Sequence, residues 1–327
     1  MEKIIDSEEI VREFTTMDEK NEYKQIIQCY QLFNKYHSQR QKIIIAWAKS
    51  FVRLYEIINS GTKTGNNDTD NQIELINGMK VYQFLSNVFN NMKKGYTINL
   101  FGGWLVRVLS GLNIVGGDLD LYVTPKISKS EIVTILDQIS DRRKYLFGLK
   151  SYSLIFQGDN KYIKFGGGID IDCYQLVFTN GIKCDLLTNR PDDSCVDFNV
   201  NQLVFTKNGI NRKVQTGNGC DWGSIFLGLY TKTGTTVKNY DKSTSLENLE
   251  VSERHHVVQM VSRYQKMLAK GLTINNFNPP IESDGSIIIE CGHKFDLEVL
   301  RKYVRQRLPW SSQCPSCFQS IVVRLNQ

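Results

Sequence analysis

The chain has 327 residues, of which 41% are hydrophobic and 23% charged, and a formal net charge of +6. This length allows two or three domains with buried cores, and the composition excludes a disordered or fibrous chain. No apolar run is long enough to cross a bilayer and the first ten residues lack a signal-peptide core, which predicts no membrane association and an intracellular, reducing compartment, the cytoplasm or the nucleus.

The first part of the chain predicts helices and a linker. Residues 1–60 have long apolar-periodic stretches with no proline or glycine, which is typical of amphipathic helices. Residues 61–72 are polar, rich in Gly, Asn and Asp, and without periodicity, which predicts a linker or loop. We therefore expect an N-terminal helical region and linker over residues 1–72, and a helix over residues 73–94.

Strands and helices then alternate along the chain. Runs of β-rich sequence lie at residues 98–101, 119–123, 152–157, 172–178 and 183–188. Helical runs lie at residues 104–110 and 129–143. This mixture predicts an α+β fold, a sheet with flanking helices, over residues 73–210.

The last third predicts a helical segment and a small module. Residues 198–206 predict one more strand followed by a turn, and residues 245–271 predict a helix that ends at a glycine. Residues 275–285 contain two prolines and break the pattern. We therefore expect a helical segment over residues 211–278 and a C-terminal module over residues 279–327.

A diglycine and two aspartates form the most informative stretch. A strand that ends at Gly102 and Gly103 lets the backbone approach a ligand closely, and the helix after it offers free N–H groups to phosphate. Asp118 and Asp120 are two apart on a predicted strand, so both carboxylates are expected on one face. Paired carboxylates suit Mg²⁺, which commonly also holds substrate phosphates. Asp185, on another predicted strand, is the candidate third ligand. Each piece alone is more often a turn or a solvated strand edge.

In this order the pieces resemble the nucleotidyltransferase superfamily related to DNA polymerase β, and within it the bacterial-type poly(A) polymerases and CCA-adding enzymes. Their G-G-x-V-R-D, short helix and D-I-D signature is matched by GGWLVRVLSG and GGDLDLYV. Their R-R-D-F-T-x-N-A-L motif is similar to CVDFNVNQLVF, and a later helical motif is similar to VSRYQKMLAKGLTI. The resemblance covers residues 80–275.

The resemblance implies transfer of a nucleotide from an NTP to RNA or to another hydroxyl acceptor. It assigns Mg²⁺ or Mn²⁺ and the catalysis to Asp118, Asp120 and Asp185. It assigns the nucleotide to Gly102, Gly103, Arg107, Asp197 and Asn201.

The chain also departs from that pattern. Leu105 is inserted after the glycines, and Val108 stands where the family has an aspartate. Cys195 and Val196 replace two arginines that hold the nucleotide in the family. The intact carboxylates favour a transferase, whereas the missing arginines favour the alternative, a ubiquitin or SUMO ligase or adaptor whose transferase-like domain only binds substrate.

The C-terminal module carries a candidate zinc site. Cys291 and His293, followed by Cys314 and Cys317, supply three thiolates and one imidazole at ligand-like spacing, which predicts a structural Zn²⁺ site rather than unrelated cysteines. The stretch resembles the second half of a RING finger with one zinc site, as in SP-RING domains, and also the zinc-free U-box. That resemblance implies docking of a ubiquitin- or SUMO-conjugating enzyme.

Other cysteines and histidines point to packing. In a chain without a secretory signal, buried free thiols are expected rather than disulfides. These predicted buried thiols are Cys29, Cys173, Cys184 and Cys195. His255 and His256 lie on a predicted amphipathic helix and are expected in packing or at the surface.

Overall fold

The computed structural model describes residues 69–92, 95–141, 148–156, 171–191, 196–206, 209–213, 222–237, 243–306 and 309–325. The helical region predicted for residues 1–60 lies outside the described residues. Among the described residues the chain forms two compact units. Unit 1 comprises residues 69–196, 200–213 and 222–231, and unit 2 comprises Asp197–Asn199 together with residues 232–325.

Unit 1 is built on a seven-stranded sheet in the order β3-β4-β5-β2-β1-β6-β7. Its strands are β1 Thr97–Phe101, β2 Leu119–Thr124, β3 Leu149–Phe156, β4 Cys173–Phe178, β5 Lys183–Leu187, β6 Leu203–Thr206 and β7 Gly209–Arg212. Only β2 and β5 are paired in parallel among these neighbours. Together with its helices this sheet confirms the predicted α+β class.

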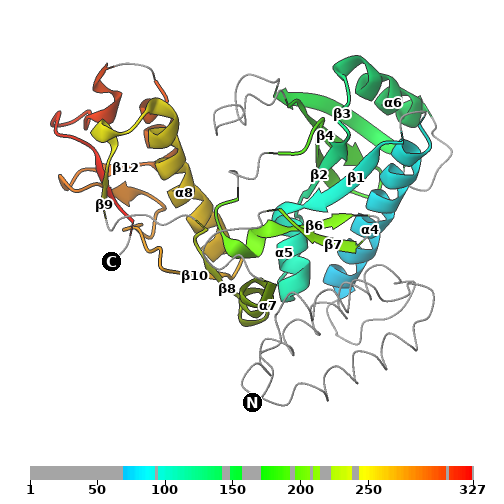
Figure 1. Ribbon diagram of the computed structural model, residues 1–327, viewed down its shortest axis with the longest axis horizontal. Coiled ribbons are helices and arrows are strands. Elements are labelled where there is room, and N and C mark those ends of the chain that lie inside the picture. The colour runs from blue at the N-terminus through cyan, green and yellow to red at the C-terminus, as the bar shows by residue number, and fades with distance from the viewer. Residues whose placement is uncertain are drawn as a thin grey trace, which may run out of the picture. The chain divides into compact units, whose positions relative to one another are not determined.

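Three helices of unit 1 pack against strands of this sheet, and the fourth, α7, packs against α5 (Figure 1). They are α4 Thr69–Asn90, α5 Gly102–Ser110, α6 Lys129–Asp141 and α7 Trp222–Thr231. Phe84 of α4 packs edge-on against Phe178 of β4, and Asp137 of α6 accepts a 2.5 Å hydrogen bond from the hydroxyl of Tyr152. Tyr152 contacts the ring of Tyr174, which lies on the same side of β4 as Phe178. Helices α4 and α6 therefore share one face, and we call the opposite one the open face.

Three elements differ from the sequence predictions. The helix predicted for residues 245–271 covers Val251–Ala269, and a strand and a 3-10 helix precede it. Helix α4 begins at Thr69, so residues 69–72 are helical and not part of a linker. The strand predicted for residues 198–206 is a 3-10 helix, η2 Asn199–Gln202, followed by the shorter β6. The side chain of Asn199 accepts a 2.9 Å hydrogen bond from the amide of Thr235. Asparagine side chains that bind the backbone in this way compete with regular strand pairing.

Unit 2 is organised around a long helix and three small strand pairs. Its elements are β8 Thr233–Thr235, β9 Ser243–Ser245, η3 Leu246–Asn248, α8 Val251–Ala269, β10 Thr273–Asn275, β11 Ile287–Ile288, β12 Lys294–Phe295, α9 Leu297–Val304, η4 Pro309–Ser312 and β13 Val322–Arg324. Strands β8 and β10 pair in parallel, while β9 pairs with β13 and β11 with β12 in antiparallel. Helix α9 packs on α8, so the predicted C-terminal module shares a core with the helix before it.

Local signals explain the ends of α8. Glu250 and Glu253 form a reciprocal capping box at its start, which satisfies amides that the first turn leaves free. At its end Gly271 has φ +82°, a left-handed conformation that favours glycine, close to where the sequence predicts the stop. Within the described part of the chain, no helix combines the length and apolarity needed to cross a membrane.

Candidate functional site

Two of the predicted catalytic aspartates lie opposite each other on neighbouring strands. Asp120 of β2 and Asp185 of β5 are register partners in the parallel pair at the middle of the sheet. Asp185 is also paired with Gln175 of β4, and Gln175 faces away from Tyr174 because side chains alternate along a strand. Both carboxylates therefore project from the open face, and both residues are half-buried.

Asp118, the third residue of the predicted acidic group, precedes β2 and is exposed. The pKa of the buried thiol of Cys184, next to Asp185 on β5, is affected by all three carboxylates. Its pKa is raised well above the ordinary value, first by burial and then by the negative charges of Asp185, Asp118 and Asp120. The charges of all three aspartates named from the sequence thus act on one buried side chain.

The diglycine lies directly against this acidic group. Phe101, which ends β1, is the register partner of Asp120, and α5 begins at the next residue. The amide of Gly103 donates a 3.2 Å hydrogen bond to Oδ2 of Asp120. Gly102 has φ +78°, and a Cβ at this position would overlap the Asp120 carboxylate. Glycine is required here by backbone conformation and by space together.

Arg107 of α5 is near enough to Asp118 and Asp120 for their charges to affect it. Its Nη1 donates a 3.1 Å hydrogen bond to the backbone carbonyl of Asn113. Burial lowers the pKa of Arg107, and the nearby charges of Asp118, Asp120 and Glu74 oppose that shift. The charge of this helical arginine is therefore influenced by three carboxylates.

The open face continues beyond the aspartates through residues that the sequence did not single out. Gln175 is paired with Asp185, and Ser153 of β3 is paired with Gln175. Phe101, Asp120, Asp185, Gln175 and Ser153 consequently form one row across five strands. Gln175 is half-buried and Ser153 is exposed, so the row offers an amide and a hydroxyl beside the carboxylates.

An apolar cluster lies next to this row on the same face. It consists of Tyr122, Ile171, Cys173, Leu187 and Val204, with Phe101 packed against it. Lys213 is buried and places its ammonium 4.0 Å from the centre of the Phe101 ring, a favourable cation–π distance. Sequence reasoning missed Lys213 because only the pairing of distant segments brings it to Phe101.

The two remaining predicted nucleotide ligands belong to different units. Asn201 is half-buried in η2 of unit 1. Asp197 is buried in unit 2, where its carboxylate forms an ion pair with Arg263 and lies 3.9 Å from Nε2 of His256. Asp197 and Arg263 come from two of the stretches that carry the family resemblance.

The hard-cation site predicted at the aspartates stays a prediction, and the pairing of two strands is what the structure adds to it. Its donors are carboxylate oxygens on adjacent strands, and the Gly103 amide orients one of them. Oxygen donors of this kind are what Mg²⁺ and Mn²⁺ prefer in proteins.

The predicted zinc ligands converge in unit 2. One ligand atom from each of Cys291, His293, Cys314 and Cys317 lies within 4.8 Å of the others. Cys291 and His293 lie in the turn between β11 and β12, and their Sγ and Nδ1 atoms are 3.3 Å apart. Three sulfurs and one imidazole at this separation fit a tetrahedral Zn²⁺ site.

The second cysteine pair has the backbone of a metal-binding turn. Burial opposes ionisation of the Cys314 thiol, but amides of Ser316 and Cys317 and the neighbouring thiols of Cys317 and Cys291 together lower its pKa. Phe318 follows with φ +60° and donates its amide to the Cys314 carbonyl at 2.8 Å. The turn thus stabilises a thiolate, the form in which cysteine binds zinc.

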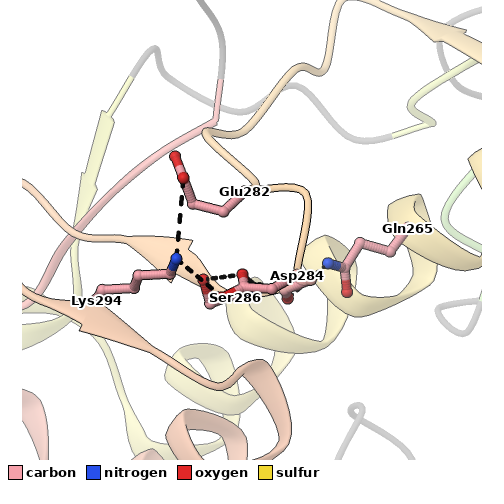
Figure 2. A network of polar contacts seen from close by, with 6 residues as sticks. Gln265, Glu282, Asp284, Ser286 and Lys294 are labelled. Carbon is pink, nitrogen blue, oxygen red and sulfur yellow. Dashed lines mark hydrogen bonds and ion pairs between the residues drawn. The ribbon is translucent and has the colours of Figure 1, made fainter.

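A polar network fixes the hairpin that carries His293 (Figure 2). Lys294 Nζ lies 2.9 Å from Oδ2 of Asp284 and 3.9 Å from Glu282. The hydroxyl of Ser286 donates a 2.6 Å hydrogen bond to Oδ1 of the same Asp284. Gln265 of α8 donates a 2.7 Å hydrogen bond to the carbonyl of Gly285 in this loop, which ties the hairpin to the long helix.

The other predicted thiols and histidines are placed as follows. Cys173 and Cys184 are buried thiols that form no disulfide, as predicted. Cys29 and Cys195 lie outside the described residues. His256 is buried and His255 is half-buried, which agrees with a packing role.

No protein-family model and no curated protein matches the chain. Among solved structures, the Thermotoga maritima CCA-adding enzyme complexed with tRNA is similar over 63% of this chain and 42% of its own, with 12% identity and a TM-score of 0.37. A CCA-adding enzyme with CTP is similar over 60% of this chain and 39% of its own, with 14% identity and a TM-score of 0.35. The chain therefore spans less than half the length of the CCA-adding enzymes to which it is similar.

Proposed function

We propose that unit 1 is a metal-dependent nucleotidyltransferase that moves a nucleotide from an NTP to a hydroxyl acceptor, with RNA as the leading acceptor class. The observation that carries this proposal is the pairing of Asp120 with Asp185 on the open face, with the Gly103 amide bound to Asp120. Two carboxylates held side by side repel each other unless a cation is bound between them. The acidic group is therefore suited to a metal that also holds phosphate.

The residues have separate roles in this proposal. Asp118 and Asp120 hold Mg²⁺ or Mn²⁺, and Asp185 joins them as a ligand and takes the proton of the acceptor hydroxyl. The bound metal supplies charge neutralisation for the phosphates and a lower pKa for that hydroxyl. The new bond joins the acceptor oxygen to the α-phosphorus, while the bond to the β-phosphate breaks and pyrophosphate leaves.

The backbone at the start of α5 supports the proposed binding of phosphate. Gly102 and Gly103 open the helix beside the Asp120 carboxylate. Helix N-termini bind phosphate through their first amides and through the positive end of the helix dipole. Asp197 and Asn201 stay predicted nucleotide contacts.

The test is transfer of labelled nucleotide. Purified full-length protein is incubated with each labelled NTP, Mg²⁺ or Mn²⁺, and a mixture of RNA acceptors. Extension of the acceptors by the wild type, and its loss in Asp185→Asn, is the expected result. Asp137→Asn is the matched control because it neutralises a carboxylate that lies on the helix-covered face, where Tyr152 binds it. Equal extension by wild type and Asp185→Asn would place the chemistry elsewhere.

A second candidate function rests on the zinc site. In the C-terminal part of unit 2, Val299, Trp310 and Phe318 are exposed by 60%, 51% and 73% of their surface. Large exposed apolar side chains are commonly part of a protein-binding surface. We propose as the alternative that unit 2 recruits a ubiquitin- or SUMO-conjugating enzyme and that unit 1 binds the substrate.

Discharge of ubiquitin or SUMO from charged conjugating enzymes tests this alternative. Stimulated discharge that is lost in Trp310→Ala and kept in Lys302→Ala, an exposed change on α9, is the supporting result. The absence of both binding and stimulation would leave the zinc site with an architectural role.

A further inference from the structure

The segment between α5 and β2 is fixed unusually well for a short connection. The helix ends at Gly111, which has φ +65°, and the amide of Leu112 donates a 2.9 Å hydrogen bond to the carbonyl of Arg107. Residues 112–117 then lead directly into Asp118. Because these residues set where Asp118 lies, whatever fixes them also fixes one predicted metal ligand.

Four consecutive amides in this segment have acceptors. The amide of Ile114 donates to Oδ1 of Asn71 at 2.9 Å, and the amide of Val115 donates to Oδ1 of Asn113 at 2.9 Å. The Glu74 carboxylate accepts from the amide of Gly116. The amide of Gly117 donates to the carbonyl of Ile114 at 3.0 Å.

Arg107 closes the segment from the other side. Its Nη1 holds the carbonyl of Asn113, and a Cβ placed on Gly117 would overlap its Nη2. The guanidinium thus contacts Asn113 near the start of the segment and lies against Gly117 at its end. The negative charges of Glu74 and Asp118 also act on it. An arginine suits this place because its planar group donates in several directions at once.

We infer that Arg107 is a positioning residue: together with Asn71 and Glu74 of α4, it holds residues 112–117 and thereby sets the position of the Asp118 carboxylate for the metal. This inference rests on the proposed metal-dependent function of unit 1. It differs from the phosphate contact that the family resemblance implies for Arg107, because the guanidinium is engaged by the protein's own backbone.

Positioning and simple charge balance make opposite predictions. Arg107 is a cation beside a cation site, so its charge alone weakens metal binding. If it acted only as a counter-ion, Arg107→Gln would bind Mn²⁺ more tightly. If it holds the segment, the same change binds Mn²⁺ more weakly in spite of the lost repulsion.

Gly117→Ala separates the two roles further. The new methyl group displaces the guanidinium but leaves its charge in the molecule. Gly117 has no positive φ, so the substitution acts through space and not through backbone strain. Lys129→Gln is the matched control, since it removes one positive charge from an exposed position at the start of α6.

The experiment is Mn²⁺ titration of the full-length protein, followed by electron paramagnetic resonance. We expect Arg107→Gln and Gly117→Ala to weaken Mn²⁺ binding about tenfold each, or about 1.4 kcal/mol, with melting temperatures near that of the wild type. Arg107→Lys, which keeps the charge and one donor, should recover part of the affinity. Lys129→Gln should match the wild type. Tighter binding in Arg107→Gln with no change in Gly117→Ala would overturn the inference.

Amide hydrogen exchange separates this inference from the proposed function. Arg107→Gln and Gly117→Ala should accelerate exchange at residues 114–117 whether or not metal is present. Unchanged exchange there would overturn the positioning role even if Mn²⁺ binds. Absence of Mn²⁺ binding in the wild type, together with accelerated exchange in the variants, would instead remove the metal function and keep only the fixed segment.

Discussion

Gly102 lies so close to Asp120 that the carboxylate occupies the space a Cβ would need. We expect Gly102→Ala to abolish nucleotide transfer and Mn²⁺ binding, because the methyl group moves Asp120 away from Asp185. Gly181→Ala is the matched control: Gly181 has φ +87° with nothing within 4 Å of its Cβ position, so only the backbone cost of about 1 kcal/mol applies. Thermal denaturation and metal titration of both variants measure the difference.

Asp120→Asn should remove activity without removing the fold. The change deletes a metal ligand, and it also relieves repulsion between paired carboxylates. In metal-free buffer the melting temperature should hold or rise, and added Mg²⁺ should stabilise the variant less than the wild type. Calorimetry with and without Mg²⁺ tests this, and a variant that retains transfer would show that Asp120 is not a ligand.

Gln175→Leu tests the row beyond the aspartates. Gln175 is the register partner of Asp185 on the open face, where its amide can bind the acceptor or the nucleotide. Loss of one such hydrogen bond should lower kcat/KM about tenfold. Gln83→Leu, the same exchange at an exposed position of α4, should leave kcat/KM unchanged. Equal kinetics in both variants would confine the site to the three aspartates.

The zinc site should bind one Zn²⁺ per chain. Binding at such sites contributes on the order of 10 kcal/mol to folding, so chelation should unfold unit 2, including the β9–β13 pair and the packing of α9 on α8. Cys314→Ser should lose the metal, whereas Cys173→Ser, a change at a buried cysteine of the sheet, should retain it. Two zinc ions per chain, or a metal-free unit 2 that stays folded, would contradict this site.

His255 should make unit 2 sensitive to acid. Burial lowers its pKa to about 4, and the charges of Arg305, Arg301 and Arg263 add to that shift, while a hydrogen bond to the Arg301 backbone opposes it. As the pH falls, His255 is therefore protonated at a higher pH in the unfolded chain than in the folded chain. The stability present above the ordinary pKa near 6.5 is lost as the pH falls toward 4.

The expected loss is on the order of 1 kcal/mol after allowance for the half-exposed ring. Melting temperatures of wild type and His255→Gln at pH 5 and pH 7, with zinc content measured at each pH, give the comparison. A variant as acid-sensitive as the wild type would assign the effect to other groups.

Local sequence patterns predicted the strands at the centre of the sheet, but not which residues on the neighbouring strands lie beside the aspartates. The order of Gly102, Asp118 and Asp185 along the chain led to the prediction of the acidic group. Gly102 follows β1, Asp118 precedes β2 and Asp185 lies within β5. Gln175 could not be named, since its importance depends on the register of β4 against β5. Register is set by contacts between distant segments.

The sequence also did not predict the partner of Asp197 or the helix α7. The partner of Asp197 is Arg263, 66 residues later, and no local pattern links them. Helix α7, Trp222–Thr231, is apolar on most sides and lacks the amphipathic period by which surface helices are recognised. The predicted boundaries at residues 211 and 279 remain predictions.

The short segment Asp197–Asn199 affects how the protein can be made. It belongs to unit 2, although the residues on both sides belong to unit 1. During synthesis, Asp197 must wait for 66 further residues before Arg263 emerges, which takes about 3 to 13 seconds at ordinary elongation rates. The segment Asp197–Asn199 is therefore synthesised with unit 1, but its contacts form only when unit 2 has been synthesised. If the chain is divided at one point between the two units, the fragment that contains unit 1 also contains Asp197, the buried acidic residue of unit 2.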